Sequence, residues 1–427
     1  MGMQTETEVV VVGGGVAGLA AATYLARGGR KVVVLERASE PGGRARTQER
    51  EGFHFNEGPH ALYRGGLAES VLRELGVPVR GGVPPTRGSL ALRGGTIFKL
   101  PVGAGSLLAT RLLPFAAKRQ IGALLTRLSS IDPAPLAGVP LADWVNETLL
   151  HPDARALFRA LVRLTTYAAD DRISAGTALA QLQLASRHGV IYLDAGWQTL
   201  VDGLSASARA AGARILCGRT VSAVEPGPPH TVRLADGSTF TAPVVLVAAA
   251  PAALQTLLPH DCTIASWSDT AIPVRAACLD LALSRLPVPR HRFALGIDDA
   301  VYFSVHSLSA ALAPPGGALI HVARYLRAGE SGESASLEAI ADLLQPGWRG
   351  ALVHARFLPA MTVTPWLPTA ATAGLAGRPP VAHPTLRGVF LAGDWVGSEG
   401  MLVDGALASA RRAAALALES RATSAAA

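Results

Sequence analysis

Cysteine is scarce in this sequence, and its scarcity excludes two kinds of architecture. The 427 residues include only three cysteines, an odd number with no CxxC spacing among them. A disulfide framework needs paired cysteines, and a common zinc site needs closely spaced ones. The sequence therefore predicts neither, and we expect no metal ion. Unpaired cysteines are typical of proteins in a reducing cytoplasm.

Lysines and runs of like charge are also scarce. Only three of the 39 basic residues are lysines, and the formal net charge is +7. The arginines are scattered, no run of five like charges occurs, and aromatic residues make up 5% of the chain. Proteins that bind nucleic acid gather their basic residues on one face or stripe. The positive charge is therefore interpreted as a solvated surface, and no nucleic-acid partner is predicted.

Long apolar runs are missing as well. No stretch reaches 18 uninterrupted apolar residues, so no transmembrane helix is predicted. Glu6 and Glu8 precede the first apolar run, where a secretory signal would carry positive charge. These features favour a cytoplasmic location. Residues 107–128 mix leucines with basic residues and leave two interpretations open: a surface that rests on a membrane, or an ordinary amphipathic helix pair.

What the sequence does have is length and a clear nucleotide-binding pattern at its start. Half of the residues, 49%, are apolar, and 427 residues suit two domains. Val9–Val12 is a continuous apolar run, typical of a parallel strand that is buried on both faces. An Ala-rich and Leu-rich helical pattern follows over Val16–Ala26, and Val32–Leu35 is a second such strand. The three elements predict a βαβ unit.

The rest of the sequence leaves this pattern and returns to it at the end. Residues from about 90 to 187 predict mostly helices, and Asp236–Gly237 predicts a hairpin turn. Val389–Ala392 and Val403–Leu418 then predict a last strand and a long helix. We expect an α/β fold in which a discontinuous Rossmann-like domain encloses an inserted α+β domain. The Rossmann-like domain is assigned to residues 1–80, 195–260 and 385–427, and the inserted domain to residues 81–194 and 261–384.

Residues 13–18, GGGVAG, form a G-x-G-x-x-G pattern between the first strand and the helix. Gly13 allows a tight turn, Gly15 lets the backbone approach a pyrophosphate, and Gly18 lets the helix pack on the strand. The start of the helix at Val16 and Ala17 offers free N–H groups to the phosphates. The pattern, with a strand before it and a helix after it, predicts a dinucleotide site.

Glu36 and Arg37 follow the second strand and complete this site. The Glu36 carboxylate can accept hydrogen bonds from both ribose hydroxyls, and it would repel a 2′-phosphate. A ligand of the NADP type is therefore disfavoured. Arg37 is included among the predicted cofactor-binding residues.

A second glycine motif identifies the dinucleotide. Residues 40–46, EPGGRAR, resemble the second glycine motif of the flavin amine oxidase superfamily, which includes monoamine oxidases, protoporphyrinogen oxidases and phytoene desaturases. The resemblance implies that Gly42, Gly43 and Arg44 lie along the FAD pyrophosphate and ribityl chain. Two glycines allow close backbone approach, and a guanidinium binds phosphate with two hydrogen bonds. An enzyme that binds NAD alone would leave this motif unused.

Three further segments carry the same resemblance. Residues 56–60, NEGPH, and the C-terminal segments LAGDW at 391–395 and MLVDGA at 401–406 are similar to flavin motifs of the superfamily. No cysteine lies near the C-terminal motif, so FAD is expected to be bound non-covalently. The Rossmann-like domain is expected to bind FAD, and the inserted domain is expected to bind the substrate. The resemblance implies that the isoalloxazine ring, the adenine and the ribityl chain are contacted by Gly58, Pro59, His60, Val221, Gly393, Asp394, Met401, Leu402 and Val403.

The sequence departs from the amine-oxidising members in two places. Those members place a lysine in the substrate domain, whereas this chain has none after Lys118. They also carry an aromatic residue where this chain has Leu402, and leucine cannot form an aromatic cage for an amine. Both departures favour a small, largely apolar organic substrate and the phytoene desaturase-like branch.

The predicted activity is therefore FAD-dependent dehydrogenation, with hydride transfer to flavin N5 and oxygen or a quinone as electron acceptor. An amine or amino-acid oxidase that makes hydrogen peroxide stays an alternative, as does a flavin-bound non-redox isomerase or scaffold. His60 is the candidate catalytic base, because imidazole titrates near neutrality; a packing role for it is equally open. Trp395 is interpreted as a core residue rather than a wall beside the ring. The oligomeric state is not predicted.

Overall fold

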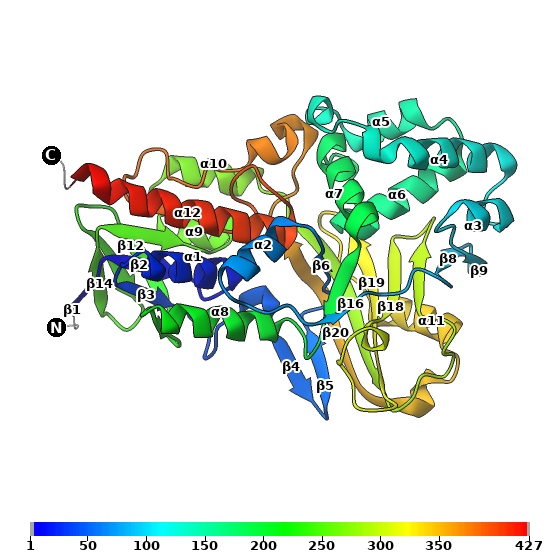
Figure 1. Cartoon of the computed structure of the whole chain (residues 1–427), viewed down its shortest axis with the longest axis horizontal. Helices are drawn as coiled ribbons and strands as arrows, with labels where there is room; N and C mark the ends of the chain where they lie inside the picture. Colours follow the sequence, from blue (N-terminus) through cyan, green and yellow to red (C-terminus); the bar gives the residue numbers. More distant parts are fainter. Residues whose placement is uncertain (1–3, 425–427) are drawn as a thin grey trace.

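The computed structural model describes residues 4–424, and it consists of two halves that lie side by side (Figure 1). The first half is built on a parallel sheet with the strand order β11-β3-β2-β15-β21. Its strands are apolar because both faces are covered: every residue of β2, β3, β15 and β21 is buried. The strands are β2 (Val9–Val12), β3 (Val32–Leu35), β11 (Arg214–Leu216), β15 (Val244–Val247) and β21 (Val389–Leu391).

Helices and a second sheet cover this parallel sheet. Helix α1 (Val16–Arg27) packs between α8 (Gln198–Ala210) and α12 (Leu402–Ser424), and α12 also contacts α2 (Leu67–Glu74) (Figure 1). A four-stranded sheet of order β1-β14-β13-β12 contacts β2 through β14. Its strands are β1 (Gln4–Glu6), β12 (Val221–Glu225), β13 (His230–Leu234) and β14 (Thr239–Ala242), and helices α9 (Pro251–Leu257) and α10 (Cys262–Thr270) follow in the chain.

The second half is built on a seven-stranded sheet with the order β20-β16-β19-β18-β17-β8-β9. All neighbouring strands are antiparallel except β17 and β8. The strands are β8 (Leu90–Arg93), β9 (Thr96–Lys99), β16 (Val274–Leu283), β17 (Phe293–Gly296), β18 (Val301–Val305), β19 (Ala318–Leu326) and β20 (Leu352–Thr364).

Two sets of helices pack on this sheet. Helix α11 (Ser334–Leu344) contacts β19 and β16, while α6 reaches β17 from the helical group at the upper right of Figure 1. That group contains α3 (Ala104–Ala109), α4 (Phe115–Arg127), α5 (Leu141–Thr148), α6 (Pro152–Thr166) and α7 (Ala175–His188). Within residues 4–424, no helix is both long and apolar enough to cross a membrane.

Short strands join the two halves. Strand β10 (Val190–Leu193) pairs with β6 (Leu62–Tyr63) and β7 (Gly81–Gly82), while β4 (Thr47–Arg50) pairs with β5 (Phe53–Asn56). At the end of β5, the Asn56 carbonyl accepts a hydrogen bond from Arg356 on β20, so this end of β5 meets the seven-stranded sheet.

The predicted α/β class, the βαβ unit and the hairpin at Asp236–Gly237 are confirmed. The prediction that residues 90–187 are mostly helical is wrong at its start. There, β8 and β9 form a hairpin, because Gly94 and Gly95 both adopt positive φ and turn the chain. The domain boundaries stay predictions, and residues 1–3 and 425–427 of the first domain lie outside the described part.

Gly18 is required by the fold itself, because a Cβ atom there would overlap the carbonyl oxygen of Gly13. We expect Gly18→Ala to lower the free energy of unfolding by about 3 kcal/mol, measured by urea denaturation, since the helix would have to move off β2. Gly105→Ala is the control: Gly105 lies in α3, and a Cβ there meets nothing within 4 Å. Equal unfolding midpoints for the two variants would contradict this account.

Candidate functional site

The first predicted motif forms a turn between β2 and α1. Gly13 has φ +107°, and a Cβ there would lie 2.6 Å from the carbonyl oxygen of Ala248. At Gly15, in contrast, a Cβ would meet only one atom within 4 Å, the carbonyl oxygen of Gly42 at 4.0 Å. Gly15 also has an ordinary φ of −76°. Neither packing nor backbone conformation explains why this position is glycine, so the space in front of it is available to a ligand.

The two glycine motifs meet at this space. Gly42 donates its N–H to the Gly14 carbonyl over 2.9 Å, and Gly15 and Gly42 form a parallel bridge. Gly43 is exposed beside them. No side chain caps α1 at Gly15, and the first turn of the helix contains no acidic residue. An uncapped helix N-terminus favours an anion, so this cradle of glycines fits a pyrophosphate.

Glu36 holds the turn from the other side. Its carboxylate accepts hydrogen bonds from the Gly14 N–H at 2.6 Å and the Ala38 N–H at 2.9 Å. Arg37 is exposed, and Val221 lies at the start of β12, half-buried. Glu36 therefore lies next to the cradle, where the sequence predicted a ribose partner, and Arg37 points away from the core.

Arg44 and Asp394, both predicted to contact the cofactor, contact each other. The Arg44 guanidinium donates to the two carboxylate oxygens of Asp394 over 2.8 and 2.6 Å, and it also donates to the Val363 carbonyl. The Arg44 side chain is still 48% exposed. This pair joins the start of the chain to its C-terminal motif and to β20 of the other half.

The segment 58–60 lies between the two halves. Gly58 has φ +85°, and a Cβ there would overlap the sulfur of Met361 on β20. The Tyr167 hydroxyl donates to the Pro59 carbonyl over 3.3 Å. The ring nitrogens of His60 lie 3.0 Å from the Gly58 carbonyl and 3.1 Å from the Arg44 carbonyl. Burial lowers the pKa of His60 to about 4, so its imidazole is neutral at pH 7.

The C-terminal motif leads into α12. Met401 and Val403 are buried, Leu402 has φ +54°, and Gly393 lies half-buried after β21. Trp395 is 1% exposed and donates its indole N–H to the Ala249 carbonyl over 2.9 Å. Trp395 is thus a core residue, as expected.

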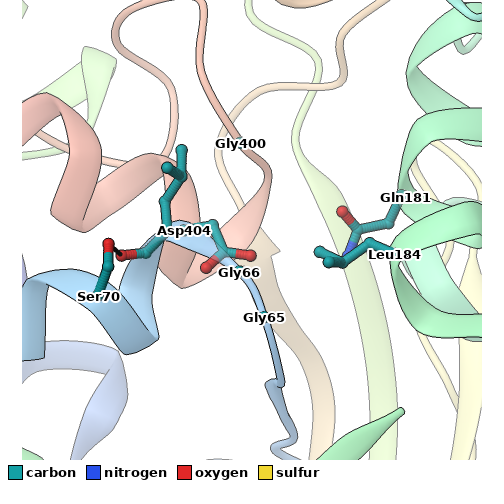
Figure 2. A pocket seen from close by; sticks show the side chains of 8 residues that line it. Gly65, Gly66, Ser70, Gln181, Leu184, Gly400 and Asp404 are labelled. Carbon is teal, nitrogen blue, oxygen red and sulfur yellow. Dashed lines mark hydrogen bonds between the residues drawn. The ribbon is translucent and has the colours of Figure 1, made fainter. Parts of the chain in front are cut away.

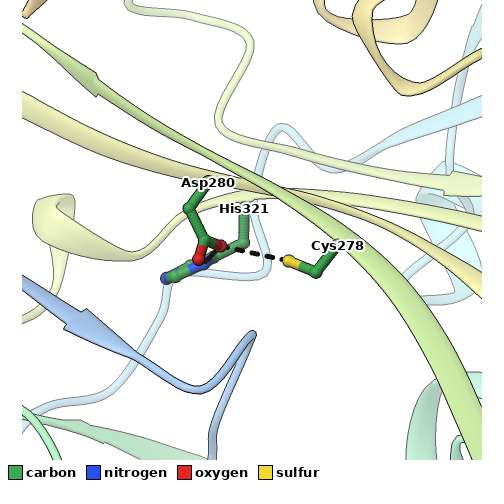
Figure 3. Close-up of side chains that lie close together, drawn as sticks. All are labelled: Cys278, Asp280 and His321. Atoms are coloured by element: carbon green, nitrogen blue, oxygen red, sulfur yellow. Dashed lines mark hydrogen bonds and ion pairs between the residues drawn. The ribbon is translucent and has the colours of Figure 1, made fainter. Parts of the chain in front are cut away.

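Sequence reasoning missed a cluster of buried polar residues behind Gly58. Asp280, in β16, accepts from Cys278 at 3.0 Å and from His321 at 2.6 Å (Figure 3). It also accepts from Arg356 at 2.6 and 3.0 Å. Burial alone would raise the pKa of Asp280, but His321 and Arg356 outweigh it and hold the pKa below its usual value. An aspartate inside the apolar run of β16 was the signal that could have revealed this cluster.

The same cluster resembles a metal site only in composition. Ligand atoms of Cys278, Asp280 and His321 lie within 4.8 Å of one another. However, the Arg356 guanidinium already neutralises Asp280, and burial together with Asp280 raises the pKa of the Cys278 thiol well above its usual value. A protonated thiol and a paired carboxylate are poor metal ligands, so we assign no metal here.

A pocket of about 420 Å³ opens at the N-terminus of α12 (Figure 2). It lies between α2, α7 and α12, and Asp404 accepts a hydrogen bond from the Ala68 N–H over 2.7 Å at one side of it. Burial raises the pKa of Asp404 to about 6. Its lining consists of Gly65, Gly66, Leu67, Ser70, Gln181, Leu184, Gly400 and Asp404.

The raised pKa of Asp404 predicts how stability depends on pH. The folded state binds this proton more tightly than the unfolded state, so the stability it gives is present below pH 4 and is lost as pH rises through about 6. We expect Asp404→Asn to be more stable than the wild type at pH 8 by about 3 kcal/mol and to lack this loss. Urea unfolding between pH 4 and 8 measures both, with the exposed Asp269→Asn as control. An unchanged pH slope in Asp404→Asn would refute the assignment.

Known proteins resemble this chain in sequence and in structure. A phytoene dehydrogenase of Streptomyces griseus is 48% identical over 68 residues, 16% of this chain and 13% of that protein. An L-amino-acid oxidase of Daboia russelii is 51% identical over 53 residues, 12% of this chain and 10% of that protein. The matches thus span a small part of either relative.

A solved oxidoreductase structure from Methanosarcina mazei matches with a TM-score of 0.74 and 19% identity, over 95% of this chain and 99% of that one, which supports the fold. Residues 16–273, more than half of the chain, match the family model for flavin containing amine oxidoreductases. The chain belongs to the family of flavin-containing amine oxidoreductases.

Proposed function

We propose that this chain is an FAD-dependent oxidoreductase that dehydrogenates a largely apolar organic substrate and holds FAD non-covalently. One observation carries the cofactor assignment: the open space in front of Gly15, where α1 presents its uncapped N-terminus. The two glycine motifs and Glu36 surround this space. In this proposal, residues 1–80, 195–260 and 385–427 hold FAD, and residues 81–194 and 261–384 hold the substrate.

The substrate side is assigned from what packs against residues 58–60. Cys278, Tyr302 and Tyr325 are buried together on β16, β18 and β19, and Tyr167 and Met361 pack against them. Met361 and Tyr167 also contact Gly58 and Pro59. If residues 58–60 lie beside the flavin ring, this mostly apolar, tyrosine-containing surface faces the reacting atoms. Such a surface suits an apolar substrate better than an amine.

In the proposed reaction, the cofactor accepts electrons, and the side chains and backbone of the protein bind and position it. Bound FAD would supply the hydride acceptor. Arg44, half-exposed and paired with Asp394, would bind the pyrophosphate region, and Gly15 and Gly43 would let the backbone approach it. A neutral imidazole has a single N–H, so His60 donates to one of the two carbonyls beside its ring, that of Gly58 or that of Arg44. Either bond ties the 58–60 segment in place, so we assign His60 a positioning role, and its role as a base stays a hypothesis.

Two other functions remain candidates. The likeness to an L-amino-acid oxidase favours amine oxidation, against which stand Leu402 and the lack of lysine after Lys118. A non-redox isomerase would bind the flavin without net reduction of it. We propose a cytoplasmic location and oxygen or a quinone as acceptor. We also propose a peripheral membrane contact through α3 and α4, where the apolar side chains of Leu108 and Phe115 are 72% and 76% exposed.

Gly15→Ala tests the cofactor assignment. The new methyl group would enter the space assigned to the pyrophosphate and would meet only one protein atom, the Gly42 carbonyl oxygen at 4.0 Å, without overlap. We expect the variant to fold with wild-type stability and to bind FAD at least tenfold more weakly, measured by flavin fluorescence titration. Gly105→Ala should bind FAD normally. Wild-type affinity in Gly15→Ala would contradict the proposed cradle.

The rate at which oxygen reoxidises the reduced flavin distinguishes the candidate reaction classes. The purified protein, with FAD added, is photoreduced without air and then mixed with oxygen while the visible flavin band is recorded. Slow return of the oxidised band is expected of a dehydrogenase or desaturase, and reduction of a quinone should be faster. Rapid return would favour the amine oxidase candidate. The lack of any flavin band would contradict the proposed function.

A further inference from the structure

The buried cluster behind Gly58 contains two imidazole nitrogens that lack a hydrogen-bond partner. They are Nδ1 of His306 and Nε2 of His321, on side chains that are at most 1% exposed. The centroids of the two rings are 4.4 Å apart. A buried polar atom without a partner costs about 1–3 kcal/mol, so two such atoms on neighbouring rings call for an explanation.

The hydrogen bonds of the cluster allow one of these nitrogens to donate and the other to accept. The Asp280 carboxylate can only accept, so Nδ1 of His321 carries the hydrogen in their 2.6 Å bond, and in a neutral imidazole this leaves Nε2 as an acceptor. On the other side, the Tyr302 hydroxyl lies 2.9 Å from Nε2 of His306; either atom can be the donor, and a proton relay requires the hydroxyl to donate. Nδ1 of His306 then carries a hydrogen. In this arrangement the two unpartnered nitrogens are a donor and an acceptor, on rings whose centroids are 4.4 Å apart.

We propose that Tyr302, His306, His321 and Asp280 form a relay that stores one proton beside the cofactor. The Tyr302 oxygen takes a proton from the substrate side while its own proton moves to Nε2 of His306. His306 gives its Nδ1 proton to Nε2 of His321, and Asp280 stabilises the resulting imidazolium. Tyr302 and His306 each gain and lose one O–H or N–H bond, His321 gains one N–H bond and keeps the proton, and Asp280 stays an ionised carboxylate throughout.

This inference rests on the proposed function, which supplies the other half of the reaction. Bound FAD would accept two electrons from the substrate as hydride, and the remaining proton would enter the relay, so no electrons would pass along it. The relay ends where the cofactor is proposed to lie: Arg356, which pairs with Asp280, donates to the carbonyl of Asn56, two residues before Gly58.

Charge decides where the proton stays. The carboxylates of Asp280 and Glu57 lie 2.6 and 3.9 Å from the Arg356 guanidinium. Two negative charges thus face one positive charge, and a protonated imidazole would balance the second negative charge. Burial lowers the pKa of His306 well below its usual value, so the proton does not remain there. His321 is the imidazole bonded to the carboxylate. The titratable and charged groups around the relay are Glu57, His60, Tyr167, Tyr192, Cys278, Tyr325 and Arg356.

Proton uptake during photoreduction tests the relay without a known substrate. The FAD-loaded protein is photoreduced without air in weak buffer near pH 7, and a pH-indicator dye counts the protons taken up per flavin. Negative charge on the reduced cofactor should draw a proton into the relay. We expect the wild type to take up about one proton more per flavin than His321→Gln or His306→Gln.

His383→Gln is the matched control, because His383 is also buried and pairs with an aspartate, Asp261, at 3.3 Å, outside this cluster. It should take up as many protons as the wild type. His306→Gln leaves the Asp280 ion pairs in place, so it decides the question if His321→Gln does not fold.

Equal proton counts in the wild type and in a flavin-loaded His306→Gln or His321→Gln would overturn the relay alone. A wild type that shows no flavin band would instead overturn the proposed function. The two failures are thus distinguished by the spectrum recorded before photoreduction.

Discussion

The first half of the structure depends on a backbone contact between α1 and β2. At Gly18 the helix lies so close to the turn at Gly13 that no side chain fits between them. This contact fixes where α1 begins, and therefore where its uncapped N–H groups point. The second glycine motif reaches the same place because Gly42 pairs with the turn. Residues 58–60 then continue from there to the seven-stranded sheet.

Much of the fold could be predicted from local patterns. The valine runs of β2 and β3 are apolar because they are buried on both faces, and the glycine turn follows from sterics within a few residues. The hairpin of β8 and β9 was missed because a short apolar run fits a helix or a strand equally well, and the turn at Gly94 and Gly95 was not weighed against it.

The polar contacts of the site are harder to predict, since they join distant parts of the chain. Arg44 and Asp394 are 350 residues apart, and Asp280 meets His321 and Arg356 over 41 and 76 residues. No spacing rule links such residues; the register of β16 with β19 and β20 brings them together. A resemblance to a family locates motifs in the sequence, but it does not reveal that two motif residues neutralise each other.

The strand order of the parallel sheet has a consequence for biosynthesis. Strand β21 lies at the edge of the sheet beside β15, yet it comes from residues 389–391, near the end of the chain. During synthesis, β2, β3, β11 and β15 emerge from the ribosome before β21. The edge of β15 that pairs with β21 therefore stays unpaired until almost the entire chain has emerged. The seven-stranded sheet is complete at residue 364 and can form earlier. The half that begins the sequence is therefore the last to close.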